Sequence, residues 1–168
     1  VAYGNREKRQ QIINSDAEFV IINYDGVNIV EQDIIDANFD MIVVDEANAY
    51  KTASTARWKS LNRIIRPHTW LWMLTGTPAS QSPLDAYGIA KLVNPTATPR
   101  SFTLYRDQVM NKITAFKWSP KKDAERVVQT MLQPAIRFTK EQCLDLPDLL
   151  YAEREVPMTA QQVRYYEK

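Results

Sequence analysis

Two polar clusters in this sequence each follow a short run of apolar residues. Asp45 and Glu46 follow the run at residues 41–44, and the Thr-Gly-Thr cluster at residues 75–77 follows the run at residues 70–74. Adjacent carboxylates at the end of a strand can hold a hydrated Mg²⁺ with the first group and orient a water molecule with the second. Phosphoryl transfer requires mainly such positioning and charge neutralisation from a protein. The carboxylate pair therefore predicts hydrolysis of a nucleoside triphosphate.

The apolar runs predict the elements that position these clusters. A short apolar run bounded by turn signals is typical of a strand buried on both faces. Between the two runs, Trp58, Leu61 and Ile65 fall on one side of a predicted helix that has Ser54 as its N-cap. A strand, a helix and a second strand in this order form a parallel unit. Ligands of such sheets bind beyond the carboxyl ends of the strands, so both clusters should lie at one edge.

The whole chain is predicted to be an α/β protein with a mostly parallel sheet flanked by helices. A further buried strand is expected over residues 18–23, ending in a turn signal at residues 24–26. Other helices are expected over residues 6–13 and 30–37 and in the last eight residues, 161–168. Two more should begin at Ser82-Pro83 and Ser119-Pro120, on either side of a proline-containing loop at residues 94–100; the second has an apolar face formed by Ala124, Val127, Val128, Met131 and Leu132.

Composition restricts the class of protein. The 168 residues are 45% hydrophobic, which suffices for one domain with a sizeable core. The net charge is +1, so a surface that binds nucleic acid must be local. Cys143 has no second cysteine to pair with, which fits a reducing compartment, the cytoplasm or in a eukaryote the nucleus. The longest apolar runs are too short to span a membrane.

The two clusters also resemble a known family. Residues 45–48, Asp-Glu-Ala-Asn, resemble motif II (Walker B) of helicase superfamily two, and residues 74–78, Leu-Thr-Gly-Thr-Pro, resemble motif III in the form found in Swi/Snf-like DNA translocases. Further segments resemble the same family in the same order and extend the similarity over nearly the whole chain. They are residues 3–6, residues 20–25 (motif Ib), residues 51–54, residues 137–140, Leu146-Pro147 and a strand ending near Met158.

The resemblance implies a RecA-like fold and a role for each cluster. Asp45 would anchor the Mg²⁺ of bound ATP, and Glu46 would polarise the attacking water. Thr75, Gly76 and Thr77 would couple the nucleotide site to DNA and to movement between two lobes. An ordinary strand-to-helix turn, in which Gly76 supplies an unusual backbone angle and a threonine caps the helix, is the alternative for residues 75–77.

The resemblance also suggests residues for coupling and for DNA contact. Asn48 stands where the family commonly has histidine; an amide can donate and accept hydrogen bonds but cannot titrate. Asn23 and Tyr24 end the motif Ib segment, and Lys51 follows motif II, so these three could contact the backbone of double-stranded DNA. The alternative for any one basic residue is a solvated surface position.

The sequence contains no Gly-x-x-x-x-Gly-Lys-Ser/Thr phosphate loop. The resemblance implies that this loop lies upstream of Val1, and that the second lobe with its arginine finger lies downstream of Lys168. Residues 1–135 are therefore predicted to be the later part of the first RecA-like lobe, an incomplete lobe, and residues 136–168 the connection to the second lobe and its start. Such a fragment should not hydrolyse ATP alone.

Two other functions compete with the motor. The first is a degenerate lobe that binds DNA or protein without hydrolysis, which Asn48 and the missing phosphate loop favour. The second is a metal-dependent nuclease that uses Asp45 and Glu46, although the further acidic ligands of a two-metal site are missing.

The aromatic residues and the histidine are assigned mainly to structure. Trp58, Trp70 and Trp72 fall on predicted core positions and should pack inside the protein rather than stack on bases. Trp118, beside a lysine in an expected loop, could do either. His68 precedes the second apolar run in a loop and has no neighbouring histidine or cysteine, so it should be solvated rather than a metal ligand.

Overall fold

The computed structural model describes residues 1–143 and 150–167. The chain divides into two compact units, Val1–Ala135 and Ile136–Lys168. The segment Leu146-Pro147, which carried part of the family resemblance, lies outside the described residues. No helix in the described part of the chain is both long enough and apolar enough to cross a membrane.

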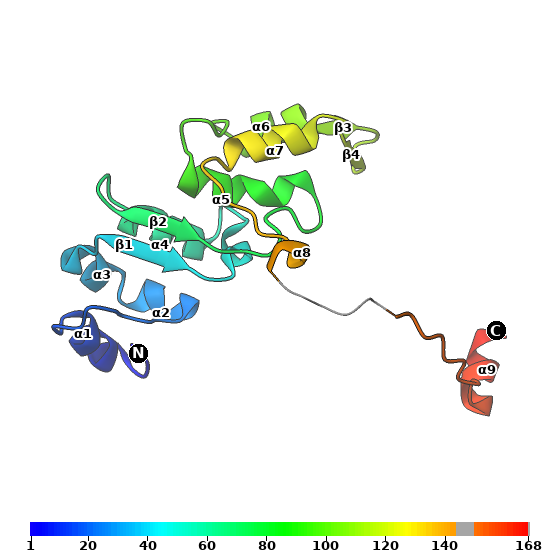
Figure 1. The fold of residues 1–168 in the computed structure, drawn as a ribbon, viewed down its shortest axis with the longest axis horizontal. Helices are drawn as coiled ribbons and strands as arrows, with labels where there is room; N and C mark the ends of the chain where they lie inside the picture. Colours follow the sequence, from blue (N-terminus) through cyan, green and yellow to red (C-terminus); the bar gives the residue numbers. More distant parts are fainter. Residues whose placement is uncertain (144–149, 168) are drawn as a thin grey trace. The chain divides into compact units, whose positions relative to one another are not determined.

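The first unit contains the predicted parallel strand–helix–strand unit. Strands β1 (Met41–Val44) and β2 (Trp70–Met73) pair in parallel, with Met41 opposite Trp70 and Val44 opposite Met73. Between them lie the 3₁₀ helix η1 (Ala47–Tyr50) and helix α4 (Ala56–Ile64), and Figure 1 shows α4 behind the sheet. Both strands thus end at the same edge, as the sequence predicted.

Helices and a hairpin surround this pair. The remaining elements of the first unit are α1 (Arg6–Ile13), α2 (Tyr24–Ile29), α3 (Glu31–Ala37), η2 (Pro83–Asp85), α5 (Ala86–Val93), α6 (Phe102–Val109), β3 (Met110–Lys112), β4 (Trp118–Pro120) and α7 (Ala124–Met131). In the second unit, α8 (Lys140–Cys143) and α9 (Ala160–Tyr166) are helical. Thr159 and Gln162 cap α9 reciprocally, which explains why a helix begins there.

The core next to the site joins β1, η1, α4 and α5. Val44, Tyr50, Trp58 and Leu61 are buried there with Ile89. The indole Nε1 of Trp58 donates to the carbonyl of Gly88, on α5, at 2.8 Å, which satisfies the polar end of a buried tryptophan. The core assignment of Trp58 is therefore confirmed.

A second core joins α5, α6 and α7. Tyr87 and Tyr105 stack with their ring centroids 5.3 Å apart, and Ala124 and Met131 of α7 are buried beside them. The antiparallel hairpin β3–β4 extends from the end of α6 and leads into α7. In Figure 1 the hairpin lies at the end of α6 and α7 that is remote from β1 and β2.

The sheet is not buried on both faces, contrary to the prediction. Met41, Val43, Trp70 and Trp72 are 48% to 69% exposed, while the alternate residues of both strands face the helices. Among the described residues, helices pack on one face only, so every second side chain of the two strands contacts solvent. The expectation that Trp70 and Trp72 pack inside the protein is wrong for this chain.

Three predictions around the N-terminal helices need correction. The expected strand over residues 18–23 is reduced to one bridge between Ala2 and Ile22, because the following residues continue as a helix. That helix, α2, occupies the predicted turn at residues 24–26, with an extended Asn23 before it. In α4 the cap is Thr55, whose hydroxyl accepts from the backbone N–H of Trp58, rather than Ser54.

Three further predictions fail in the later part of the chain. Residues 118–120 belong to a strand, and α7 begins only at Ala124, because the hairpin ladder pairs Pro120 with Met110 at its end. A proline is tolerated at such a terminal position. Helix α6, capped by the hydroxyl of Ser101, was not anticipated. Residues 150–159 contain no strand, since that stretch has no pairing partner among the described residues of its unit.

Candidate functional site

The carboxylate pair and the threonine cluster are held together by backbone hydrogen bonds beyond the ends of the strands. The N–H of Leu74 donates to the carbonyl of Val44 at 2.8 Å, and the N–H of Ala47 donates to the carbonyl of Leu74 at 2.8 Å. These two bonds continue the parallel ladder past β1 and β2. As a result, Asp45, Glu46 and Thr75 emerge at the same edge of the sheet.

Glu46 has an unusual backbone conformation. Its φ is 50° and its ψ is 55°, the left-handed region that residues other than glycine rarely adopt. Its N–H donates to Oδ1 of Asp45 at 3.0 Å, and both side chains are exposed. Strained backbone of this kind is concentrated at functional sites, where the surrounding structure maintains it.

Tyr24 connects the motif Ib segment to Glu46. Its hydroxyl donates to the carbonyl of Glu46 at 3.3 Å. Its ring meets Tyr50 edge-on, with centroids 5.6 Å apart, and the Arg57 guanidinium lies 5.2 Å from the ring centroid. Arg57 in turn pairs with Asp25 at 2.8 Å. The ring is therefore fixed on two sides while its hydroxyl points to the site.

The surroundings of Tyr24 favour the protonated form of its hydroxyl. Burial raises the pKa of Tyr24, and the carboxylates of Asp45 and Glu46 raise it further, while Arg57 opposes them. A protonated phenol can donate a hydrogen bond to the Glu46 carbonyl, whereas a phenolate cannot.

The structure gives three other predicted residues local partners. Asn23 accepts at Oδ1 from the guanidinium of Arg9 at 2.9 Å. The ammonium of Lys51 lies 3.5 Å from Oδ1 of Asp85. Asn48 lies in η1 with its side-chain oxygen buried, and this oxygen has no hydrogen-bond partner among the described residues. Asn23 and Lys51 thus have structural roles beside any contact with DNA.

The threonine cluster forms a tight turn in which glycine is not required. The N–H of Thr77 donates to Oγ1 of Thr75 at 3.3 Å. The φ of Gly76 is not in the left-handed region, and a Cβ at this position would meet no described atom within 4 Å. The alternative in which Gly76 supplies an unusual backbone angle is therefore wrong.

The donor set fits one hydrated magnesium ion. Mg²⁺ commonly takes one or two carboxylates and completes its shell with waters and phosphate oxygens, and Asp45 is exposed at the strand end with Oδ2 available. Among the described residues, no three His, Cys, Asp or Glu side chains are grouped to hold a metal. The two-metal nuclease therefore gains no support. His68 is exposed in the turn before β2, as expected.

Comparison with known proteins identifies the family. A family model described as the SNF2-related domain matches residues 1–168. The chain belongs to the SNF2-related domain family. Two curated relatives are both named "SWI/SNF-related matrix-associated actin-dependent regulator of chromatin subfamily A-like protein 1". The protein of Xenopus laevis is 34% identical over 80 residues and that of Xenopus tropicalis 30% over 80 residues.

The alignment with each Xenopus relative covers 48% of this chain and 8% of the relative. The chain thus matches only a small part of the relatives' length. No solved structure matches the chain. The SNF2-related domain family is one of helicase-like ATPases, and nucleotide and DNA binding are typical of that family.

Sequence reasoning missed the structural roles of two residues that shape the site. Arg57 follows motif II and could be expected only to contact DNA phosphates; its contact with the Tyr24 ring was not predicted. Asp85, the partner of Lys51, follows the proline that begins η2. Neither pairing has a local signal, because the partners are far apart in the sequence.

Proposed function

We propose that this SNF2-related chain is a fragment of an ATP-dependent DNA translocase, in which residues 1–135 are the later part of the first RecA-like lobe. The observation that supports this most is the ladder that brings Asp45, Glu46 and Thr75 to one edge of the parallel pair. The second lobe would be supplied by the same longer protein, beginning in residues 136–168. The cofactors would be ATP and Mg²⁺.

The proposed mechanism assigns one task to each side chain. Asp45 would hold Mg²⁺, which when bound neutralises charge on the phosphate oxygens. Glu46 would accept a hydrogen bond from the attacking water and orient it, within about 2.6–3.2 Å. The left-handed backbone at Glu46, held by Tyr24, would fix the direction of that carboxylate. Thr75, Gly76, Thr77 and Asn48 would transmit the nucleotide state to DNA.

Double-stranded DNA is the proposed substrate of the motor. Asn23, Tyr24 and Lys51 lie near the site, and contacts from such groups to phosphates position a duplex without reading its sequence. The names of the two relatives refer to the regulation of chromatin, which supports DNA as the partner and a nuclear location in a eukaryote.

The test is ATP hydrolysis by the longer protein that carries this chain, with and without duplex DNA. We expect stimulation by DNA in the wild type and a loss of about 100-fold or more in Glu46→Gln, because a neutral amide oxygen polarises the attacking water far less than a carboxylate does. Binding of ATP should be retained. Glu18→Gln, which changes an exposed glutamate in a loop, is the control and should hydrolyse normally. The 168-residue chain alone should be inactive.

A non-hydrolysing binding lobe is the second candidate. The unsatisfied oxygen of Asn48 favours it, because a residue that cannot titrate and has no described partner offers little for coupling. Salt-dependent DNA binding by the longer protein, without ATP hydrolysis in the presence of any nucleic acid tested, would support this candidate and overturn the proposal of a motor.

A further inference from the structure

The β3–β4 hairpin and the residues beside it carry an excess of positive charge. Residues 106–122 contain five lysines and arginines and one acidic residue, a net charge of +4. The rest of the chain, with sixteen basic and nineteen acidic residues, has a net charge of −3. Residues 51–66 also contain five basic residues and no acidic one, but Lys51, Arg57 and Arg63 are each paired with a carboxylate. The near-neutral total therefore conceals local basic segments, and a basic surface is the form that binds polyanions.

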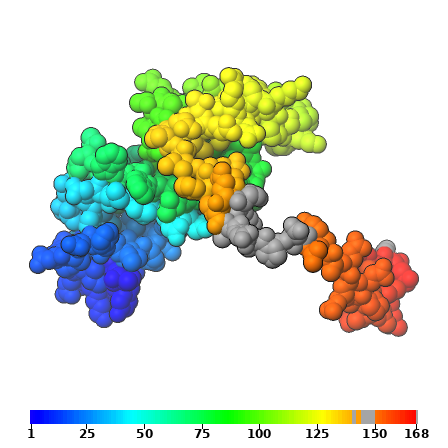
Figure 2. All heavy atoms as spheres, viewed as in Figure 1, coloured from blue at the N-terminus to red at the C-terminus, as the bar shows by residue number. Residues whose placement is uncertain are grey.

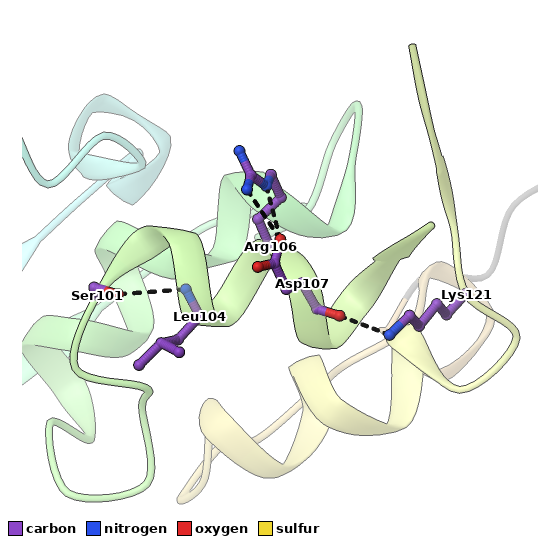
Figure 3. A network of polar contacts seen from close by, with 5 residues as sticks. All are labelled: Ser101, Leu104, Arg106, Asp107 and Lys121. Atoms are coloured by element: carbon purple, nitrogen blue, oxygen red, sulfur yellow. Dashed lines mark hydrogen bonds and ion pairs between the residues drawn. The ribbon is translucent and has the colours of Figure 1, made fainter. Parts of the chain in front are cut away.

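The lysines of this hairpin are available to a ligand. Lys112, Lys117, Lys121 and Lys122 form no ion pair with a carboxylate in the described part of the chain. Lys121 instead donates to the backbone carbonyl of Asp107, as Figure 3 shows. The contact fixes the base of the hairpin against α6 and leaves the ammonium charge uncompensated.

The tip of the hairpin is ordered by its own hydrogen bonds. The N–H of Ile113 donates to the carbonyl of Lys117 at 2.9 Å. Oγ1 of Thr114 accepts from the N–H groups of Phe116 and Lys117 at 3.3 Å and 3.0 Å. These bonds order the backbone of the turn, and the Phe116 side chain on it is 98% exposed. An exposed apolar ring on a hydrogen-bonded turn, between Lys112 and Lys117, is suited to stacking on a base.

A groove adjoins this tip. It has a volume of about 560 Å³ and is lined by Arg106, Lys112, Ala115 and Trp118, among others. The guanidinium of Arg106 lies 4.2 Å from the centroid of the Trp118 ring. The groove is open to solvent, and it places the aromatic surface of Trp118 and the side chain of Arg106, which also pairs with Asp107 at 3.0 Å, beside the hairpin tip. The hairpin, yellow-green in Figure 2, is part of the open surface of the first unit.

We propose that the β3–β4 hairpin binds single-stranded DNA, with Lys112 and Lys117 on phosphates and Phe116 stacked on a base. A single strand fits better than a duplex, because a duplex covers the faces of its bases by stacking, whereas Phe116 requires an uncovered face. The choice of DNA over RNA rests on the proposed function. The surface is separate from the predicted contacts of the motor, Asn23 and Tyr24, which lie beside the sheet.

The test is fluorescence anisotropy of a labelled 15-nucleotide oligothymidylate titrated with the 168-residue chain. We expect Phe116→Ala to weaken binding by about 5-fold or more, as for removal of one stacked base. Phe19→Ala, which removes a phenylalanine that is 86% exposed elsewhere, is the matched control and should bind normally. Circular dichroism should be unchanged in both variants, because neither ring is buried.

Charge is tested separately by salt dependence. Each phosphate contact to a single strand contributes about 0.7 to the slope of log K against log salt concentration. Lys117→Gln should lower that slope by about this amount, whereas Lys8→Gln, on the exposed side of α1, should leave it unchanged. Equal binding of the oligothymidylate by wild type, Phe116→Ala and Lys117→Gln would overturn the proposal. It would also be overturned if Phe116→Ala weakened binding of a 15-base-pair duplex as much as binding of the oligothymidylate.

The two proposals fail in distinguishable ways. Loss of ATP hydrolysis in Glu46→Gln concerns only the site at the sheet edge, and oligonucleotide binding by the hairpin is measured without nucleotide. If the hairpin variants bind normally while the longer protein hydrolyses ATP, the hairpin inference alone is refuted. If the hairpin variants lose oligonucleotide binding while the longer protein does not hydrolyse ATP, the motor alone is refuted. Equal preference for an oligouridylate would overturn the choice of DNA.

Discussion

Gly88 is the position where the structure permits the sharpest prediction. It is the third residue of α5, and its N–H donates to the carbonyl of Lys51 at 3.1 Å. A Cβ on Gly88 would lie 2.2 Å from the carbonyl oxygen of Tyr50 and 2.4 Å from that of Lys51. Both obstacles are backbone atoms, so a rotamer change cannot relieve them. Glycine is therefore required for α5 to pack against the loop that follows Asp45 and Glu46.

The size of the effect follows from one favourable and two unfavourable contributions. Alanine is favoured over glycine in a helix by about 0.5–1 kcal/mol. Forcing an additional methyl group into a packed site costs about 1–3 kcal/mol, and more when the backbone must move. Displacing α5 would also weaken the hydrogen bond from Trp58 to the Gly88 carbonyl, which contributes about 1 kcal/mol. We expect Gly88→Ala to lower the free energy of unfolding by about 2 kcal/mol.

Urea denaturation of the 168-residue chain measures this directly. With a slope near 2 kcal/mol per molar urea, the midpoint should fall by about 1 M. Gly76→Ala is the matched substitution, because the space around Gly76 is open and its φ is ordinary; it should change stability by no more than about 0.5 kcal/mol. A Gly88→Ala midpoint equal to that of the wild type would refute the packing argument.

Two tyrosines provide further tests. Tyr24→Phe should keep the ring packing and remove only the hydrogen bond to the Glu46 carbonyl, so stability should fall by about 0.5–1 kcal/mol in urea, while ATP turnover by the longer protein falls several-fold; unchanged turnover would separate Tyr24 from the site. Burial, with a smaller contribution from Tyr24, raises the pKa of Tyr50 to about 12. Since the unfolded tyrosine loses its proton near pH 10, the contribution of Tyr50 to stability should be constant below pH 10 and fall by up to about 1.4 kcal/mol per pH unit between pH 10 and 12. Tyr24, Tyr87 and Tyr105, whose pKa values are also raised, add to this slope. Tyr50→Phe should reduce that slope, and an identical pH profile in the variant would contradict the assignment.

Local patterns predicted the elements that carry the site. The apolar runs at residues 41–44 and 70–74 became a parallel pair, and Arg6–Ile13 and α3 formed close to the expected positions. These segments have a clear period and clear ends, so local preference and tertiary packing agree. The prediction that Asp45 and Thr75 lie at the same edge of the sheet required only that the two strands be parallel.

Predictions failed where long-range pairing decided the structure. Ser119-Pro120 has the sequence of a helix start, but pairing with Met110 recruits it into a hairpin strand. Tyr24 begins a helix rather than a turn, and its contact with Glu46 spans 22 residues of sequence. The residues of a single helix or strand give no indication of either contact. The position of the Tyr24 hydroxyl therefore could not be predicted from the sequence.

The exposed face of the sheet connects the sequence pattern with the proposed incomplete lobe. A half-buried strand alternates apolar and polar side chains, whereas β1 and β2 are apolar at every position, as in parallel strands covered on both sides. In this chain Met41, Val43, Trp70 and Trp72 are instead exposed together. The sequence pattern of the two strands suits a sheet that is covered on both faces, whereas the structure covers only one face of the sheet. A lobe whose remaining layer is supplied by another part of a longer protein accounts for both observations, whereas a self-sufficient binding module does not explain why two tryptophans share a solvent-facing surface.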